Sequence, residues 1–281
     1  MHNFNERILR AGFIKALENK LVFSGLANSS FSGEINQKND IVKLIQLGAI
    51  DISSYVDGTD ITNQSLTDAA LELIADQDKY FAYVLDTLEY NNVKNGILSE
   101  AARKAAYASM SNVDARFASL YGDAGIVQNT NASPVDMTSL TVEDDFLTMG
   151  ESFAEAGVSR DQRKVAIIPP WVSTKLALAG ISSKTDNSAL YGAGFVASAL
   201  GWDFVESNNI SKNSTSWDKS RIMCVVPEQS LGFASAVTAF ETAPVEKQIG
   251  KTLVKGRFVY GAKVVRPDMT GVLYADKTAE A

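Results

Sequence analysis

The segment "NGILSEAARKAAYASMSNVDARFASLYG", Asn95 to Gly122, constrains the fold more than any other part of the chain. Small and apolar residues recur in it at spacings of three and four, which places them on one face of an α-helix: Leu98, Ala102, Ala105, Ser109, Val113, Phe117 and Leu120. We predict a spine helix over residues 95–121 that is roughly 40 Å long, with Gly122 as its C-terminal cap. Its alanines suit close approach to a sheet or to another helix, and its charged residues are expected on the solvent-facing sides: Arg103, Lys104, Asp114 and Arg116.

The residues before this helix predict extended structure. Residues 1–39 mix short apolar clusters with Asn and Ser, which indicates an N-terminal arm. Residues 40–73 alternate apolar and polar side chains around the turn "DGTD", Asp57 to Asp60, which predicts a long hairpin ribbon. A two-stranded ribbon is marginal alone in water, so it must pack against something else, with a second copy of the chain as one option. Residues 78–86, rich in aromatics, predict a strand.

The second half of the chain alternates helices with short apolar strands, which indicates an α+β fold with a buried sheet. Gly125 to Met137 reads as a linker. A helix should then begin at Thr141, with Asp144 at capping-box spacing, and end at Gly157. Strands are expected in "KVAIIPP", "WDFVESNNI", "RIMCVVP", "RFVYGAKVVRP" and "GVLYA", helices in "WVSTKLALAG" and "GAGFVASALG", and a helix or turn in "EQSLGFASAVT".

Side chains that carry chemistry are scarce. His2 is the single histidine and Cys224 the single cysteine, so nucleophilic triads, disulfides and histidine metal sites are not expected. We interpret Cys224 as a small core residue. The acids Glu143 to Asp145 fit the first turn of a helix, where the dipole favours negative charge.

Two further motifs are weak. Gly192, Gly194 and Ala197 match G-x-G-x-x-A, but no strand precedes them, so we interpret the glycines as the start of a short helix. Asp76 to Tyr80 lacks the Gly and the distal Glu of an EF-hand, so a surface turn is favoured over a calcium loop. We therefore predict no catalytic, metal or cofactor site.

Net charge and hydropathy argue against a nucleic-acid-binding protein and against a membrane or secreted protein. A formal charge of −7 disfavours a free-standing nucleic-acid-binding protein. The C-terminal region is nonetheless basic, and we interpret it as a solvated face in preference to a polyanion-binding one: Lys247, Lys251, Lys255, Arg257, Lys263 and Arg266. No uninterrupted apolar run of about 18 residues occurs and no signal-peptide core is visible, which predicts synthesis in the cytoplasm and no membrane contact.

Three stretches resemble one known family. They are "SSYVDGTDITNQSLTDAALELIADQDKYFAYVLDTLE", "ALGWDFVESNNI" and "AFETAPVEKQIGKTLVKGRFVYGAKVVRPDMTGVLYA". Taken in order, they are similar to the extended loop, an axial-domain strand and loop, and the closing segment of tailed-phage major capsid proteins of the Hong Kong 97 type. They are similar especially to those of the gene-5-type coat proteins of podoviruses.

This resemblance implies a Hong Kong 97-like capsid fold and a virion location. It implies an N-terminal arm at 1–39, an extended loop at 40–73, a peripheral domain at 74–137 and 243–281 with its spine helix, and an axial domain at 138–242. Hexamers and pentamers of the chain would close an icosahedral shell around double-stranded DNA. Portal, scaffolding and decoration proteins would be further partners.

Some members of the family form Lys-Asn crosslinks, but none is expected here at Lys38 or Lys43. The nearest alternative is an encapsulin-type nanocompartment shell, which shares the fold. The alternative from another class is a nucleotide-binding α/β enzyme based on Gly192 to Ala197.

Overall fold

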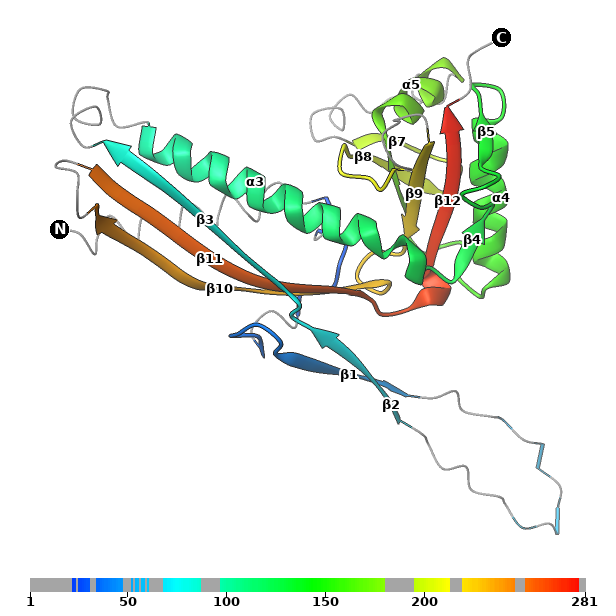
Figure 1. Cartoon of the computed structure of the whole chain (residues 1–281). Coiled ribbons are helices and arrows are strands. Elements are labelled where there is room, and N and C mark those ends of the chain that lie inside the picture. The colour runs from blue at the N-terminus through cyan, green and yellow to red at the C-terminus, as the bar shows by residue number, and fades with distance from the viewer. Residues whose placement is uncertain are drawn as a thin grey trace.

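The computed structural model describes residues 22–23, 25–30, 34–47, 68–86, 97–179, 195–212, 219–245 and 251–277, together with residues 52, 54–55, 57–58 and 60 of the ribbon. These residues form two sheets, a long helix and a ribbon that projects away from both sheets (Figure 1). The observed mixture of helices and strands confirms the predicted α+β class.

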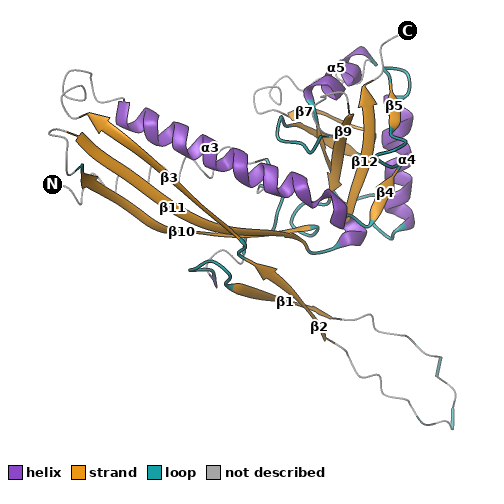
Figure 2. Ribbon diagram, in the orientation of Figure 1, coloured by secondary structure: helices purple, strands orange, loops and turns teal. Residues whose placement is uncertain are grey.

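The long helix lies along one face of a three-stranded antiparallel sheet (Figure 2). The sheet has the order β10-β11-β3 and consists of β3 (Gln77–Asp86), β10 (Leu231–Pro244) and β11 (Lys251–Val264). Helix α3 (Ile97–Ser119) packs Ala106 and Met110 against Phe81, Phe240 and Val254 of this sheet. Apolar side chains alternate with polar ones along β11, so one of its faces meets the helix.

The prediction for the spine helix is confirmed in position and largely in orientation. Ser109, Val113, Phe117 and Leu120 of the expected stripe are buried, and Arg103 and Lys104 are exposed. Asp114 contradicts its prediction, because only 4% of it is exposed. Gly122 is not an α-helical cap either, since the chain tightens into the 3-10 helix η2 (Leu120–Asp123) before it turns away.

The second sheet has seven strands in the order β4-β12-β9-β6-β8-β7, with β5 also paired to β12. Its strands are β4 (Ile126–Gln128), β5 (Val135–Met137), β6 (Val165–Ile168), β7 (Phe195–Ala199), β8 (Trp202–Glu206), β9 (Lys219–Val225) and β12 (Thr270–Lys277). Helices α4 (Val142–Glu155) and α5 (Pro170–Leu178) cover one face of it. The core there is built around Trp202, whose indole N–H donates to the Phe146 carbonyl at 3.0 Å and whose ring meets Phe153 edge-on.

Four predictions for this half are wrong in detail. "EQSLGFASAVT" is a turn only in its first residues, 228–230, after which β10 begins at Leu231, and residues 195–199 of "GAGFVASALG" form β7 instead of a helix. Small residues in both stretches hide the strand pattern, because β-branched and aromatic side chains carry that signal. The predicted linker contains β4 and β5. The closing strand β12, which the resemblance placed in the peripheral domain with residues 243–281, pairs instead with β9 in the seven-stranded sheet, since the 3-10 turn η5 (Pro267–Met269) redirects the chain.

Helix α4 begins and ends where its sequence predicts, although its first turn differs in detail. Thr141 occupies the N-cap position without a side-chain cap, because its hydroxyl bonds within the Thr138 turn. At the other end Gly157 has φ of 88°, and the amides of Gly157 and Val158 donate to Ala154 and Phe153. This is a Schellman motif, which favours glycine at that position.

Two glycines of this helix give a matched pair of predictions. Gly157→Ala should lower the free energy of unfolding by about 1 kcal/mol, because alanine is disfavoured at positive φ. Gly150→Ala should leave it unchanged or raise it, since Gly150 is helical and an added methyl would meet Trp202 at an ordinary 3.6 Å. Denaturant unfolding of both variants checks the pair, and equal effects would contradict the cap assignment.

Candidate assembly surfaces

The ribbon is an antiparallel pair of strands whose base has one buried face and one exposed face. Strand β1 (Ile41–Leu47) pairs with β2 (Asp68–Ile74) from Ile41↔Ile74 to Leu47↔Asp68, which confirms the predicted hairpin. Val42, Leu44 and Leu73 are buried, whereas Ile41 and Ile74 are about half exposed. Alternation along the strands therefore assigns the first set to the body of the subunit and leaves the second set uncovered.

The buried face of the ribbon base packs on a surface of small residues, here called the glycine seat: Gly232, Ala234, Ala236 and Gly261. A Cβ atom at Gly261 would collide with the backbone carbonyl of Ile74, and one at Gly232 would lie 3.1 Å from Leu73 Cδ1. The ammonium of Lys263 donates to the Glu72 carbonyl at 2.9 Å. The direction in which the ribbon leaves the body is thus set by contact between backbones.

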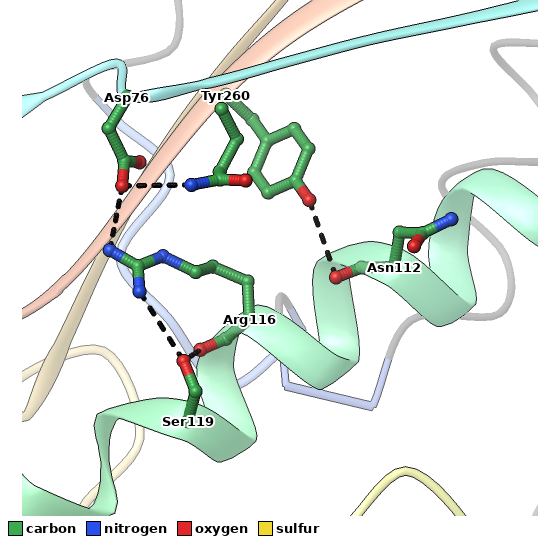
Figure 3. A network of polar contacts seen from close by, with 6 residues as sticks. Asp76, Asn112, Arg116, Ser119 and Tyr260 are labelled. Atoms are coloured by element: carbon green, nitrogen blue, oxygen red, sulfur yellow. Dashed lines mark hydrogen bonds and ion pairs between the residues drawn. The ribbon is translucent and has the colours of Figure 1, made fainter.

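A polar network fixes the corner where β2 gives way to β3 (Figure 3). The Arg116 guanidinium donates to the Asp76 carboxylate at 2.8 Å, and the Tyr260 hydroxyl donates to the Asn112 carbonyl at 3.3 Å. Burial, and secondarily the charge of Asp76, raises the pKa of Tyr260 to about 12, so the hydroxyl stays a donor. Asp76 belongs to this polar network, and β3 already begins at Gln77. The surface turn predicted for Asp76 to Tyr80 is therefore wrong.

Farther out, the ribbon carries large apolar side chains in water. Ile52 is 97% exposed and Tyr55 is 72% exposed. Apolar groups on a projecting element have no core of their own to enter, so their burial requires another molecule.

The face of the three-stranded sheet opposite α3, here called the outer face, is covered at one end only. Near the glycine seat, Ala234 and Val259 pack under the ribbon base. Toward the other end Tyr80 is 80% exposed and Val84 is 50% exposed, and among the described residues no element packs over them. The outer face consists of alternate residues of the three strands: Asp78, Tyr80, Ala82, Val84, Ala239, Glu241, Lys255 and Arg257.

The charged residues of the outer face form ion pairs with one another. Arg257 binds Asp78 through two nitrogens, at 2.9 and 2.6 Å, and Lys255 lies 3.2 Å from Glu241. The hydrogen bond from Arg257 lowers the pKa of Asp78, so this carboxylate remains ionised in neutral and mildly acid solution. These pairs neutralise each other and leave Tyr80 and Val84 as the prominent contact groups.

The sequence contained signals for these surfaces that the predictions did not use. "DKYFAYVLD" is apolar on both faces, with Phe81 and Tyr83 toward α3 and Tyr80 and Val84 away from it, which is typical of a strand covered on both sides. Glycines inside a strand pattern, such as Gly261, indicate close approach of another backbone.

Four of the six basic residues of the C-terminal region have polar partners that neutralise or occupy them. Besides Lys255 and Arg257, Arg266 pairs with Asp268 at 2.8 Å and Lys263 bonds the Glu72 carbonyl. Lys247 lies outside the described residues. The arrangement agrees better with a solvated face than with a polyanion site.

The residues considered for chemistry do not converge. Cys224 is buried and burial raises the pKa of its thiol, so it is an inert core residue as predicted. Glu143 to Asp145 lie in the first turn of α4, where burial, with Asp144 adding to it, raises the pKa of Asp145 to about 6. Ala197 lies in a strand, which removes the helix that a dinucleotide site requires, while His2, Gly192 and Gly194 lie outside the described residues.

Within the described ranges, no group of three or more His, Cys, Asp or Glu side chains is placed to hold a metal ion. None of the described helices is long and apolar enough to cross a membrane.

Comparison with known proteins gives one family and a set of similar folds. The model of a phage capsid protein family matches residues 71–273. A comparison with curated protein sequences returns no match. A structure from Mycobacterium phage Che8 has 21% identity and a TM-score of 0.70, covering 90% of this chain and 91% of that one.

Two other structures are similar at lower identity. The capsid of cyanophage P-SCSP1u has 16% identity and a TM-score of 0.66, covering 92% of this chain and 89% of that one. A virus-like particle from Pyrococcus furiosus has 12% identity and a TM-score of 0.56, covering 97% and 100%. At these identities the structures establish the shared fold, which is the one that the sequence resemblance predicted.

Proposed function

The chain belongs to the phage capsid protein family, and on this premise we propose that its ribbon and its outer face are the two halves of the contact between neighbouring subunits. As a major capsid protein it is a structural component of the virion and self-assembles into the capsid shell. We assign it assembly in place of catalysis.

One observation carries the proposal: the ribbon and the free part of the outer face lie on the same side of the sheet but cannot meet within one subunit. The ribbon base occupies the glycine seat at one end of that side and the ribbon then leaves the body (Figure 1). Tyr80 and Val84, at the other end, stay exposed. A neighbour's ribbon, with its exposed Ile52 and Tyr55, can cover them.

Such a contact is heterologous, because different surfaces of the two subunits meet. Heterologous contacts form closed rings when the rotation between subunits closes, which fits the hexamers and pentamers expected of an icosahedral shell. In this arrangement the three-stranded sheet with α3 forms the peripheral domain, and the seven-stranded sheet surrounds the capsomer axis. Individually modest contacts become strong because each subunit gives one ribbon and receives another.

Other partners follow from the same assignment. A shell of this kind would enclose double-stranded DNA through non-specific contact, and portal, scaffolding and decoration proteins would bind other surfaces. The internal pairing of Arg257, Lys255 and Arg266 supports weak contact with DNA over a dedicated binding site.

A nanocompartment shell is the alternative with the same fold. The virus-like particle from Pyrococcus furiosus shows that this fold also occurs outside structures described as phage capsids. The family match over residues 71–273 favours the phage capsid.

We expect Tyr80→Lys combined with Val84→Lys to raise the protein concentration needed for assembly at least tenfold. Two lysines would place unpaired charge under the neighbour's ribbon, which costs free energy on burial. Sedimentation and negative-stain microscopy of the purified chain measure assembly, with any scaffolding partner it requires supplied equally to each variant.

The matched control is Tyr80→Phe combined with Val84→Ile, which keeps the apolar surface and should assemble like the unmodified chain. Both pairs should fold, since the two side chains are exposed in the subunit. Shells from the lysine variant at unchanged concentration would show that the outer face is not part of the contact.

A further inference from the structure

A short N-terminal segment is inserted at the junction of the two sheets. This segment, here called the strap, comprises residues 22, 23 and 25–28. Phe23 is fully buried and stacks on Phe117 of α3, with ring centroids 5.9 Å apart and an interplanar angle of 5°. Leu26 and Ala27 are also buried.

The strap contacts both halves of the subunit. Its apolar residues share one core with Val165 and Met223 of the seven-stranded sheet and with Phe233 and Phe258 of the three-stranded sheet. This core forms the boundary between the sheets, so a change in the strap alters the packing of one sheet against the other.

Backbone hydrogen bonds complete its attachment. Glu228 donates to the Leu26 carbonyl at 2.7 Å, Asn28 donates to Leu231 at 2.8 Å and Phe233 donates to Asn28 at 3.0 Å. The Glu228 and Phe233 amides belong to the body of the subunit, so their protection from solvent reports whether the strap is in place.

Asp114 of α3 lies beneath the strap. Its carboxylate accepts a hydrogen bond from the Phe23 backbone amide at 3.3 Å. The Val22 backbone amide and the Asn209 side chain also form hydrogen bonds with it. The Ser111 hydroxyl donates to the Asn209 side-chain oxygen at 3.1 Å, which links the loop after β8 to the same point. Among the described residues, the polar groups that act on the pKa of Asp114 are these amides, and no charged side chain acts on it.

We propose that the strap is a displaceable tie between the two sheets, and that the charge on Asp114 sets how tightly it is held. The geometry supports this because one buried carboxylate of the spine helix bonds both to the strap and to Asn209 in the loop after β8. The inference concerns one subunit and does not rest on the proposed contact between neighbours.

The direction of the effect follows from burial. Burial raises the pKa of Asp114 from 3.8 to about 6, against the opposing hydrogen bonds from Phe23, Val22 and Asn209. A raised pKa in the seated state means that protonation favours seating. The strap is therefore held most tightly below pH 4, and the hold weakens as pH rises through about 6. Between the two pKa values, seating weakens about tenfold for each unit of pH, and above about pH 6 it no longer changes. The interval from pH 5 to pH 8 contains one such unit, so seating should weaken about tenfold across it.

Amide hydrogen exchange of the full chain tests this, with rates corrected for intrinsic exchange and the oligomeric state held constant. In the unmodified chain, protection of the Phe23, Glu228 and Phe233 amides should fall together about tenfold from pH 5 to pH 8. Amides of the pair β9 and β12 should not follow, which separates release of the strap from global unfolding.

Two variants test whether ionisation of Asp114 causes the pH dependence of this protection. Asp114→Asn keeps the shape but cannot ionise, so protection should become independent of pH. Phe23→Ala should lower protection at every pH and retain the pH dependence. A flat profile in the unmodified chain, or an unchanged profile in Asp114→Asn, would overturn the proposal, and neither result depends on whether shells form.

Discussion

Deleting Ser54 to Ser65 is expected to leave a folded subunit that no longer closes shells. The deletion lies beyond the paired residues of the ribbon, which end at Leu47↔Asp68, so Val42, Leu44 and Leu73 keep their places on the glycine seat. What is lost is the reach of the ribbon and the apolar Tyr55. Since every subunit would lose the same contact, small losses multiply over the shell.

Circular dichroism and thermal unfolding would establish that the deleted chain folds, and sedimentation with microscopy would measure assembly. The control replaces the same residues by Gly and Ser at equal length, which preserves reach but removes side chains. Failure of both variants would assign the contact to the side chains, and failure of the deletion alone would assign it to reach. Intact shells from the deletion would show that the ribbon is not the assembly element.

Much of this fold could be predicted because periodicity reports burial along single elements. The spine helix, the ribbon and β3 each carry a long regular pattern, and each lies where its pattern indicates. β10 was missed because Gly232, Ala234 and Ala236 give it little strand character, although these small residues are what admit the ribbon base.

Periodicity could not identify what covers a face. Asp114 has the sequence character of a solvated helix residue, yet the strap buries it from far away in the chain. Tyr80 and Val84 show the converse, because they have the character of covered residues and the subunit leaves them exposed. Both cases depend on long-range or intermolecular contacts, which local sequence does not specify.

Gly261→Ala is expected to destabilise the subunit and to prevent normal assembly, although it adds only one methyl group. That methyl would collide with the Ile74 carbonyl and would lie 3.1 Å from the Ala75 Cα, and backbone cannot move aside as a flexible side chain can. Overpacking of this kind costs on the order of 1–3 kcal/mol, a value that denaturant unfolding can measure.

The matched control is Gly122→Ala, because nothing lies within 4 Å of a Cβ at that position and its backbone does not have positive φ. Its unfolding free energy and its shells should match those of the unmodified chain. If Gly261→Ala relieves the collision by shifting the ribbon base, the amides of β1 and β2 should exchange faster while those of β9 and β12 stay protected, and shells should be lost even where the subunit remains folded. Equal behaviour of the two alanine variants would mean that the glycine seat does not set the direction of the ribbon. A stable Gly261→Ala subunit that fails only in assembly would instead tie shell closure to the angle at which the ribbon leaves the body.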